Sequence, residues 1–152
     1  MDTHTKVAPL TDLYELVCDS EKGYAEAAKK MKTPQLKTFL AKLSGERSEM
    51  KQQLAIKIHL LNPEEDLDEG TLKGNLHRTW ITIREALATS TDHAVLDECA
   101  RGEDYLAKRY STVIADKETP AEALSLLREQ GTKVSVTRST ISELGKTITY
   151  TT

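Results

Sequence analysis

Residues 96–113 carry side chains at alternating steps of three and four, and this spacing constrains the fold more than any other feature of the sequence. The spaced positions are Leu96, Cys99, Glu103, Leu106, Tyr110 and Val113. Such steps keep side chains on one face of an α-helix, so the stretch predicts a helix that packs along its whole length in a bundle. Glu103 is the exception on this face, because an isolated buried carboxylate is costly. The functional question is therefore whether a proton, a cation or a metal neutralises it.

The rest of the chain has the same helical spacing, and no segment alternates with period two over a convincing length. We predict an all-α fold with four long helices and a shorter fifth helix over Thr71–Ala88. Residues 1–10 are expected to form a loose arm that closes at Pro9, and Thr11 or Asp12 to cap the first helix. The predicted domain covers residues 11–148, and residues 149–152 form a frayed tail.

Three of the other long helices have predicted buried faces, and two of these faces contain an arginine. The second helix runs from Pro34 to about Asn62, and the last begins at the capping box Thr119-Pro120-Ala121-Glu122. The second helix is expected to bury Leu36, Leu40, Leu43, Arg47, Met50, Leu54, Ile58 and Leu61. The last helix is expected to bury Leu124, Leu127, Gly131, Val134, Arg138, Ile141 and Ile148. The first helix allows two phases: Tyr14, Val17, Glu21, Tyr24, Ala28 and Met31, or Leu13, Val17, Ser20, Tyr24, Ala27 and Met31.

The segment from Pro63 to Thr91 is too long for a tight turn, since it has 29 residues. A connection of this length favours a four-helix bundle of two antiparallel hairpins joined by one long crossover that contains the short helix. In that topology Cys18 and Cys99 lie at different heights, too far apart for a disulfide, and both are expected to be buried and reduced. Trp80 is expected to anchor the crossover helix or, alternatively, to line a pocket there.

The glutamates and arginines of the helix faces lie at matching distances from their turns. Glu21 lies 13 residues before Pro34 and Arg47 lies 13 after it, while Glu103 lies 17 before Pro120 and Arg138 lies 18 after it. Equal counts from the turn of an antiparallel hairpin mean equal heights. We therefore predict a polar layer of Glu21, Arg47, Glu103 and Arg138 in which each glutamate faces the arginine of its own hairpin. The alternative is that the arginines extend to solvent and the glutamates lie at the edge.

Composition excludes several kinds of partner and site. The chain has 24 acidic and 21 basic residues and few aromatics, so nucleic acid is not an expected partner. Its longest apolar run is too short to span a membrane, which favours a cytoplasmic protein. Phosphate-binding loops, Cys-x-x-Cys pairs and nucleophile–histidine pairs at helical spacing are all missing from the sequence. A homodimer is possible, and we expect Tyr14, Ile81 and Tyr105 to supply its exposed apolar surface.

Four groups of short motifs stand out once the helices are placed. They are Glu21-x-Gly23-Tyr24 with Ala27-Ala28, Leu43-Ser44 with Arg47, Leu76-His77-Arg78-x-Trp80, and Glu98-Cys99-x-Arg101-Gly102-Glu103-Asp104 with Lys108-x-Tyr110. Together they resemble a family of bacterial four-helix-bundle proteins of unknown function within the ferritin-like superfamily, over residues 13–148. The resemblance implies a ferritin-like bundle of bacterial origin, linked to stress or stationary-phase physiology, with no established reaction.

A ferritin-like di-iron site needs a Glu from each of two helices and a Glu-x-x-His from each of the other two. Glu21 and Glu103 match the single glutamates, but the chain contains no Glu-x-x-His. The family tends to carry a histidine about where Arg138 stands here. We therefore expect a non-enzymatic structural or interaction protein with an ion-paired layer and no cofactor. The alternative is a redox or iron-handling protein that binds iron or manganese at Glu21, Glu46 and Glu103.

Overall fold

The computed structural model describes residues 6–67 and 91–147 of the 152-residue chain, and within them it contains four α-helices and no strand. The helices are α1 (Ala8–Lys30), α2 (Pro34–Leu61), α4 (Asp92–Ala115) and α5 (Leu124–Thr147), and a single 3-10 turn, η1 (Ala121–Ala123), precedes α5. The all-α prediction is confirmed for these residues. The predicted helix Thr71–Ala88, including Trp80 and Ile81, and the tail 149–152 lie outside the described residues.

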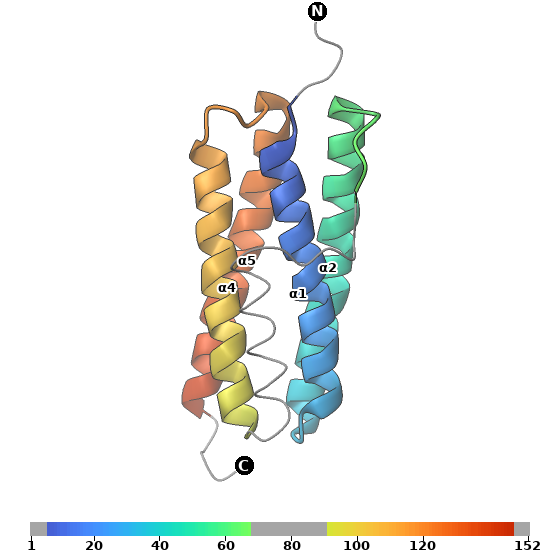
Figure 1. Cartoon of the computed structure of the whole chain (residues 1–152). Coiled ribbons are helices and arrows are strands. Elements are labelled where there is room, and N and C mark those ends of the chain that lie inside the picture. Colours follow the sequence, from blue (N-terminus) through green and yellow to red (C-terminus); the bar gives the residue numbers. More distant parts are fainter. Residues whose placement is uncertain (1–5, 68–90, 148–152) are drawn as a thin grey trace, which may run out of the picture.

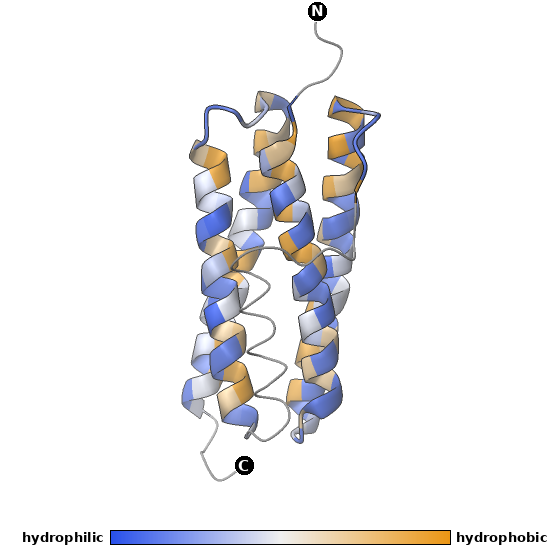
Figure 2. Ribbon diagram, in the orientation of Figure 1, coloured by the Kyte–Doolittle hydropathy of each residue, from blue (hydrophilic) through white to orange (hydrophobic). Residues whose placement is uncertain are grey.

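The helices lie side by side as a bundle (Figure 1). α1 packs along α2, α4 packs along α5, and α1 also contacts α4. The start of α4 contacts the turn between α1 and α2 through Asp92, while Pro9 and Asp12 of α1 share a surface groove with Val113 near the end of α4. Hydrophobic residues recur along each helix between hydrophilic ones (Figure 2), as expected for helices that bury one face. None of the described helices has an apolar stretch long enough to cross a lipid bilayer.

The first helix begins earlier than the sequence suggested. Helix α1 starts at Ala8, with Pro9 in its first turn, and Val7 and Leu10 are already buried. The predicted arm is therefore wrong for residues 7–10. Proline is tolerated in the first turn because the amide it lacks would have no partner within the helix.

The buried faces of α2 and α4 agree closely with prediction. Every predicted position of α4 is buried, and in α2 the sole departure is Leu61, which is half-buried. In α1 the second of the two possible phases occurs: Leu13, Val17, Ser20, Tyr24, Ala27 and Met31 are buried, and Glu21 is half-buried at the edge. Tyr14 is also buried, so it is not the exposed apolar residue that was expected.

The last helix differs from prediction in its start and in its buried face. The Thr119 hydroxyl donates to the Val113 carbonyl at the end of α4, so the predicted capping box does not form and α5 begins at Leu124. The buried residues of α5 are Leu127, Gln130, Val134, Thr137 and Ile141. Gln130 and Thr137 thus replace the predicted Gly131 and Arg138. The buried face thus continues from Leu127 to Gln130 and from Val134 to Thr137. A step of four from Val134 would instead bury the charged side chain of Arg138, which is costly.

Candidate functional site

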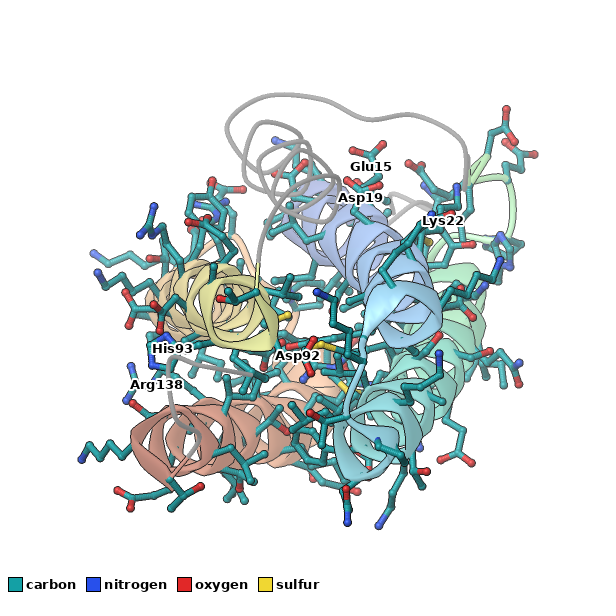
Figure 3. The ribbon with its side chains drawn as sticks, turned by 90° about the horizontal axis from the view of Figure 1, so that it is seen from below. Glu15, Asp19, Lys22, Asp92, His93 and Arg138 are labelled. Carbon is teal, nitrogen blue, oxygen red and sulfur yellow. The ribbon has the colours of Figure 1, made fainter. Side chains whose placement is uncertain are left out.

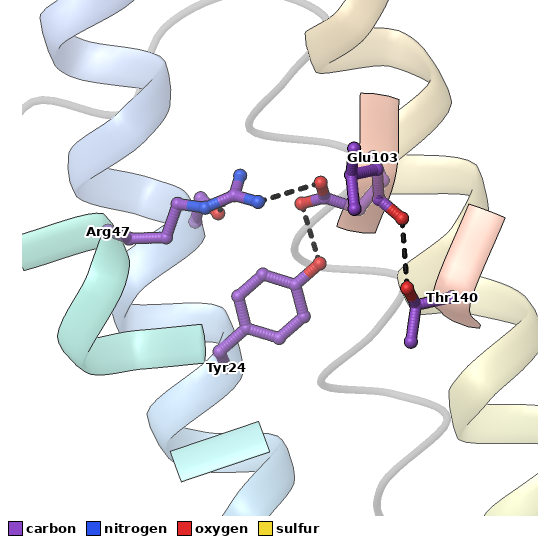
Figure 4. A network of polar contacts seen from close by, with 6 residues as sticks. Tyr24, Arg47, Glu103 and Thr140 are labelled. Carbon is purple, nitrogen blue, oxygen red and sulfur yellow. Dashed lines mark hydrogen bonds and ion pairs between the residues drawn. The ribbon is translucent and has the colours of Figure 1, made fainter. Parts of the chain in front are cut away.

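The centre of the bundle contains a buried contact between three helices. Glu103 of α4 and Tyr24 of α1 have no exposed surface, and Arg47 of α2 is 1% exposed. The Arg47 Nη2 atom lies 2.8 Å from Glu103 Oε2, and the Tyr24 hydroxyl donates to Glu103 Oε1 at 2.6 Å (Figure 4). Both oxygens of the carboxylate are therefore held by protein groups, and Glu103 is neutralised by a guanidinium.

Arg47 has further contacts that hold its side chain in the interior. Its Nη1 atom donates to the Ser20 hydroxyl at 3.4 Å, and its guanidinium carbon lies 5.6 Å from the centre of the Tyr24 ring. Contact with an aromatic face is favourable for a desolvated guanidinium. Its Nε atom has no hydrogen-bond partner in the part of the chain that is described. Two of the three guanidinium nitrogens, Nη1 and Nη2, thus have hydrogen-bond partners.

The protonation states of this contact follow from its surroundings. Burial alone would lower the pKa of Arg47, but the Glu103 carboxylate outweighs it and raises that pKa, so the guanidinium stays charged. Burial, and then the Glu103 charge, raise the pKa of Tyr24 well above its usual value. The tyrosine therefore remains a neutral hydroxyl that donates to the carboxylate.

Two of the four residues predicted for the polar layer lie elsewhere. Glu21 is at the edge of the bundle, where its Oε1 atom lies 2.7 Å from the Lys51 ammonium. Arg138 is exposed and pairs with Asp104 at 2.9 Å, and Figure 3 shows it at the outer edge of the α4–α5 pair. The predicted pairing within each hairpin is therefore wrong: Glu103 binds Arg47 of the other helix pair. Equal counts from a turn fix the height of a side chain but not the neighbouring helix toward which it points.

The three carboxylates of the metal alternative are not brought together. Glu103 is occupied by Arg47 and Tyr24, Glu21 binds Lys51, and Glu46 lines a surface groove between α2 and α5. Within residues 6–67 and 91–147, no three His, Cys, Asp or Glu side chains gather closely enough to hold a metal ion. A carboxylate must offer a free lone pair to a metal, and the Arg47 charge would repel a dication at this position.

A second buried polar contact was missed from the sequence. The Tyr110 hydroxyl donates to the Gln130 side-chain oxygen at 2.7 Å, and both residues are almost fully buried. The Gln130 side-chain nitrogen donates to the Met50 carbonyl at 3.2 Å and to the Gln53 side chain at 3.0 Å. This contact joins α4, α5 and α2. The available signal was that Gln130 follows Leu127 by three and precedes Val134 by four residues, which places it on the buried face.

The thiols and imidazoles that the structure describes do not form a metal-binding cluster. Cys18 and Cys99 are both buried and do not form a disulfide, as predicted. Burial, followed by the charges of Glu103 and Glu98, raises the pKa of Cys99, so its thiol is unreactive. His93 is buried in the first turn of α4, with Nδ1 3.4 Å from the Asp97 carboxylate. His59 is exposed and contacts the Glu65 carbonyl at 3.0 Å, and the other two histidines, His4 and His77, lie outside the described residues.

Asp92 fixes the start of α4 to the α1–α2 turn. Its carboxylate accepts the backbone amides of Lys32 at 3.0 Å and Thr33 at 2.9 Å, and the Thr33 hydroxyl at 2.7 Å. Figure 3 shows Asp92 pointing toward this turn from the start of α4. Burial alone would raise the pKa of Asp92, but these hydrogen bonds outweigh it and lower that pKa. The carboxylate therefore has a structural role.

Comparison with known proteins identifies a family without an assigned activity. A family model described as Domain of unknown function (DUF2383) matches residues 6–116. The match covers α1, α2 and α4, and therefore all three helices that supply Tyr24, Arg47 and Glu103. Searches of curated proteins and of solved structures found no match.

Proposed function

The chain belongs to this family of unknown function, and from that premise we propose that it is a non-enzymatic structural or interaction protein with an interior ion pair in place of a di-metal site. The observation that carries the proposal is the occupation of both Glu103 oxygens, one by Arg47 at 2.8 Å and one by Tyr24 at 2.6 Å. A carboxylate held in this way is neither a free base nor an open ligand.

The Arg47–Glu103 pair suits a role in specifying the bundle. Breaking a buried pair by removing one partner leaves an uncompensated charge, which costs about 3–5 kcal/mol. Alternative packings of the same helices would separate the two groups and would carry that cost. The pair therefore favours one arrangement of α2 against α4. Selecting one arrangement is the best-supported role of buried polar groups in helical bundles.

The finer fold assignment belongs to the same proposal. We infer a ferritin-like arrangement of two antiparallel hairpins, because α4 starts beside the α1–α2 turn while α1 starts beside the end of α4. A cytoplasmic location fits two buried cysteines that do not form a disulfide, since reduced thiols persist there. Bacterial origin and a link to stress physiology rest on the resemblance of the sequence motifs alone.

A double-mutant cycle with Glu103→Gln and Arg47→Met tests the ion pair. We expect a coupling energy above about 1.5 kcal/mol in urea unfolding, because each single change leaves the other group buried without its partner. The matched control is the exposed pair Asp104–Arg138, for which we expect a coupling of about 0.2–1 kcal/mol. Additive effects at Glu103 and Arg47 would contradict the proposal.

Metal analysis tests the competing proposal of an iron or manganese protein using Glu21, Glu46 and Glu103. The protein would be purified without chelator, and its metal content compared with that of the Glu103→Gln variant. We expect far less than one metal per chain in both. One iron or manganese per wild-type chain, lost in the variant, would show that Glu103 is a metal ligand and would overturn the ion-pair proposal.

A further inference from the structure

Helix α2 has an exposed glycine that its own chain does not explain. Gly45 lies in the middle of the 28-residue helix α2, where glycine is unfavourable by about 1 kcal/mol relative to alanine. A Cβ atom built on Gly45 would have no atom within 4 Å, whereas one on Gly131 would contact the Tyr110 Cβ at 3.5 Å. Packing inside the monomer therefore does not require the glycine at position 45. A glycine on an open helix face does allow another backbone to approach closely.

The charges on either side of Gly45 also have no ion-pair partner among residues 6–67 and 91–147. Lys42 and Glu49 lie three residues before and four after Gly45, on the same helix face. Neither forms an ion pair with any residue of the described ranges, and the same is true of Glu46. Lys42 and Glu49 are two helical turns apart, about 10.5 Å, so they cannot reach each other within one helix.

These features complement themselves under a two-fold rotation. If two copies of α2 cross in opposite directions at Gly45, Lys42 of each copy faces Glu49 of the other. One crossing thus forms two ion pairs and uses the glycine as the point of closest approach. Further along the same face, Ile56 and Leu60 are 63% and 71% exposed and add apolar surface. Lys42, Gly45 and Glu49 are exposed, and Lys42 and Glu49 line a surface groove between α2 and α5.

We propose that this face of α2 is the contact surface of a symmetric homodimer, with the two helices crossing at Gly45 and Lys42 paired with Glu49 of the second copy. The partner is a second copy of this chain because a single face supplies both signs of charge at matching distances from the glycine. The proposal is independent of the interior ion pair.

Charge reversal across the two-fold axis provides the sharpest test. Sedimentation of the full chain over a concentration series should show a monomer–dimer equilibrium. Lys42→Glu alone and Glu49→Lys alone should each raise the dissociation constant by about tenfold or more, because each change places like charges opposite each other twice. The double variant Lys42→Glu/Glu49→Lys should return the dissociation constant to within about threefold of wild type, because it again places opposite charges across the axis.

Two further variants separate association from folding. Gly45→Gln should weaken the dimer while it raises the thermal stability of the monomer, because glutamine is a better helix former than glycine. Lys30→Glu, an exposed charge reversal at the end of α1, should leave the dimer dissociation constant unchanged. A wild-type monomer at all concentrations, a charge swap that does not restore association, or a dimer unaffected by Gly45→Gln would each overturn the proposal.

Discussion

Two polar contacts lie inside the same bundle, one charged and one neutral. The charged contact joins Glu103 of α4 to Arg47 of α2 and Tyr24 of α1, while the neutral contact joins Tyr110 of α4 to Gln130 of α5 and, through it, to α2. Together they link all the helices of the described ranges, and α2 and α4 take part in both.

The difference between them lies in what remains when one member is lost. Removing a member of the neutral contact leaves an unpaired hydroxyl or amide, whereas removing Arg47 leaves a full negative charge in a water-excluded interior. A misassembled bundle therefore loses more stability at the charged contact than at the neutral one. The neutral contact orients α5, and its loss costs less free energy. Five measurements would break or sharpen this comparison, from the largest expected effect to the smallest.

Arg47→Met should lower the free energy of unfolding by about 3–5 kcal/mol, because Glu103 loses its cation while it stays buried. The measurement is urea denaturation at neutral pH followed by circular dichroism. Arg47→Lys, which retains the charge but not the planar guanidinium, should lose clearly less. Equal losses in the two variants would show that shape rather than charge stabilises this position.

Tyr24→Phe should lower the free energy of unfolding by about 1.5–3 kcal/mol, the range for a hydrogen bond to a charged group. The ring is kept, so its contact with Arg47 survives and the loss reports the hydroxyl alone. Denaturation of the variant beside wild type measures it. A loss below about 0.5 kcal/mol would mean that the 2.6 Å hydrogen bond contributes little to stability.

Gln130→Leu should lower the free energy of unfolding by about 1–2 kcal/mol, because the Tyr110 hydroxyl is left buried without its acceptor. The double variant Gln130→Leu/Tyr110→Phe removes both partners and should recover part of the loss. If the double variant were less stable by the full sum of two single changes, the two side chains would not be coupled and the neutral contact would have no energetic meaning.

Alkaline pH should destabilise the bundle through both buried tyrosines, Tyr24 and Tyr110. Burial raises the pKa of Tyr24 and of Tyr110, so each phenol is protonated in the folded state at a pH where the unfolded chain has released that proton. Stability is thus fully present below about pH 10, the usual tyrosine pKa, and falls as the pH rises above it, by up to about 1.4 kcal/mol per unit for each tyrosine. Denaturation between pH 9 and 11, roughly spanning that usual value, should show a shallower fall for Tyr24→Phe and for Tyr110→Phe. A slope unchanged in both variants would contradict this assignment.

Arg138→Met should change the free energy of unfolding by less than about 1 kcal/mol, because its pair with Asp104 is exposed and screened by solvent. The same denaturation measurement applies. A loss comparable to that of Arg47→Met would mean that Arg138 takes part in the interior after all, as its sequence position had suggested.

The sequence identifies helices well where apolar residues dominate their buried faces. In α2 and α4 the spacing of leucines leaves one consistent phase, so even the buried Arg47 and Glu103 were placed correctly. In α5 the apolar residues are fewer, and Gly131 or Gln130 could follow Leu127 equally well. Alternating steps of three and four from Leu124 lead to Gly131 and Arg138, whereas the structure buries Gln130 and Thr137.

The pairing of the charges could not be derived from the sequence. Turn counting gave the heights of Glu103 and Arg138 but not the direction of either side chain around its helix. A change of one residue in the phase of α5 turns Arg138 by about 100° and moves it from the interior to solvent. Arg47 then becomes the cation nearest Glu103. The neutral contact was not predicted for a related reason. An amide or a hydroxyl on a predicted buried face is less conspicuous in a sequence than a charged group.

The carboxylate of Asp92 reaches back to amides that lie 59 and 60 residues earlier in the chain. Sliding the second pair of helices along the first would break three hydrogen bonds at once, so the lengthwise alignment of the two pairs is set at this end. The segment that connects α2 to α4 is therefore not needed to set this alignment. Its length and composition can therefore drift over evolutionary time without shifting Glu103 away from the height of Arg47.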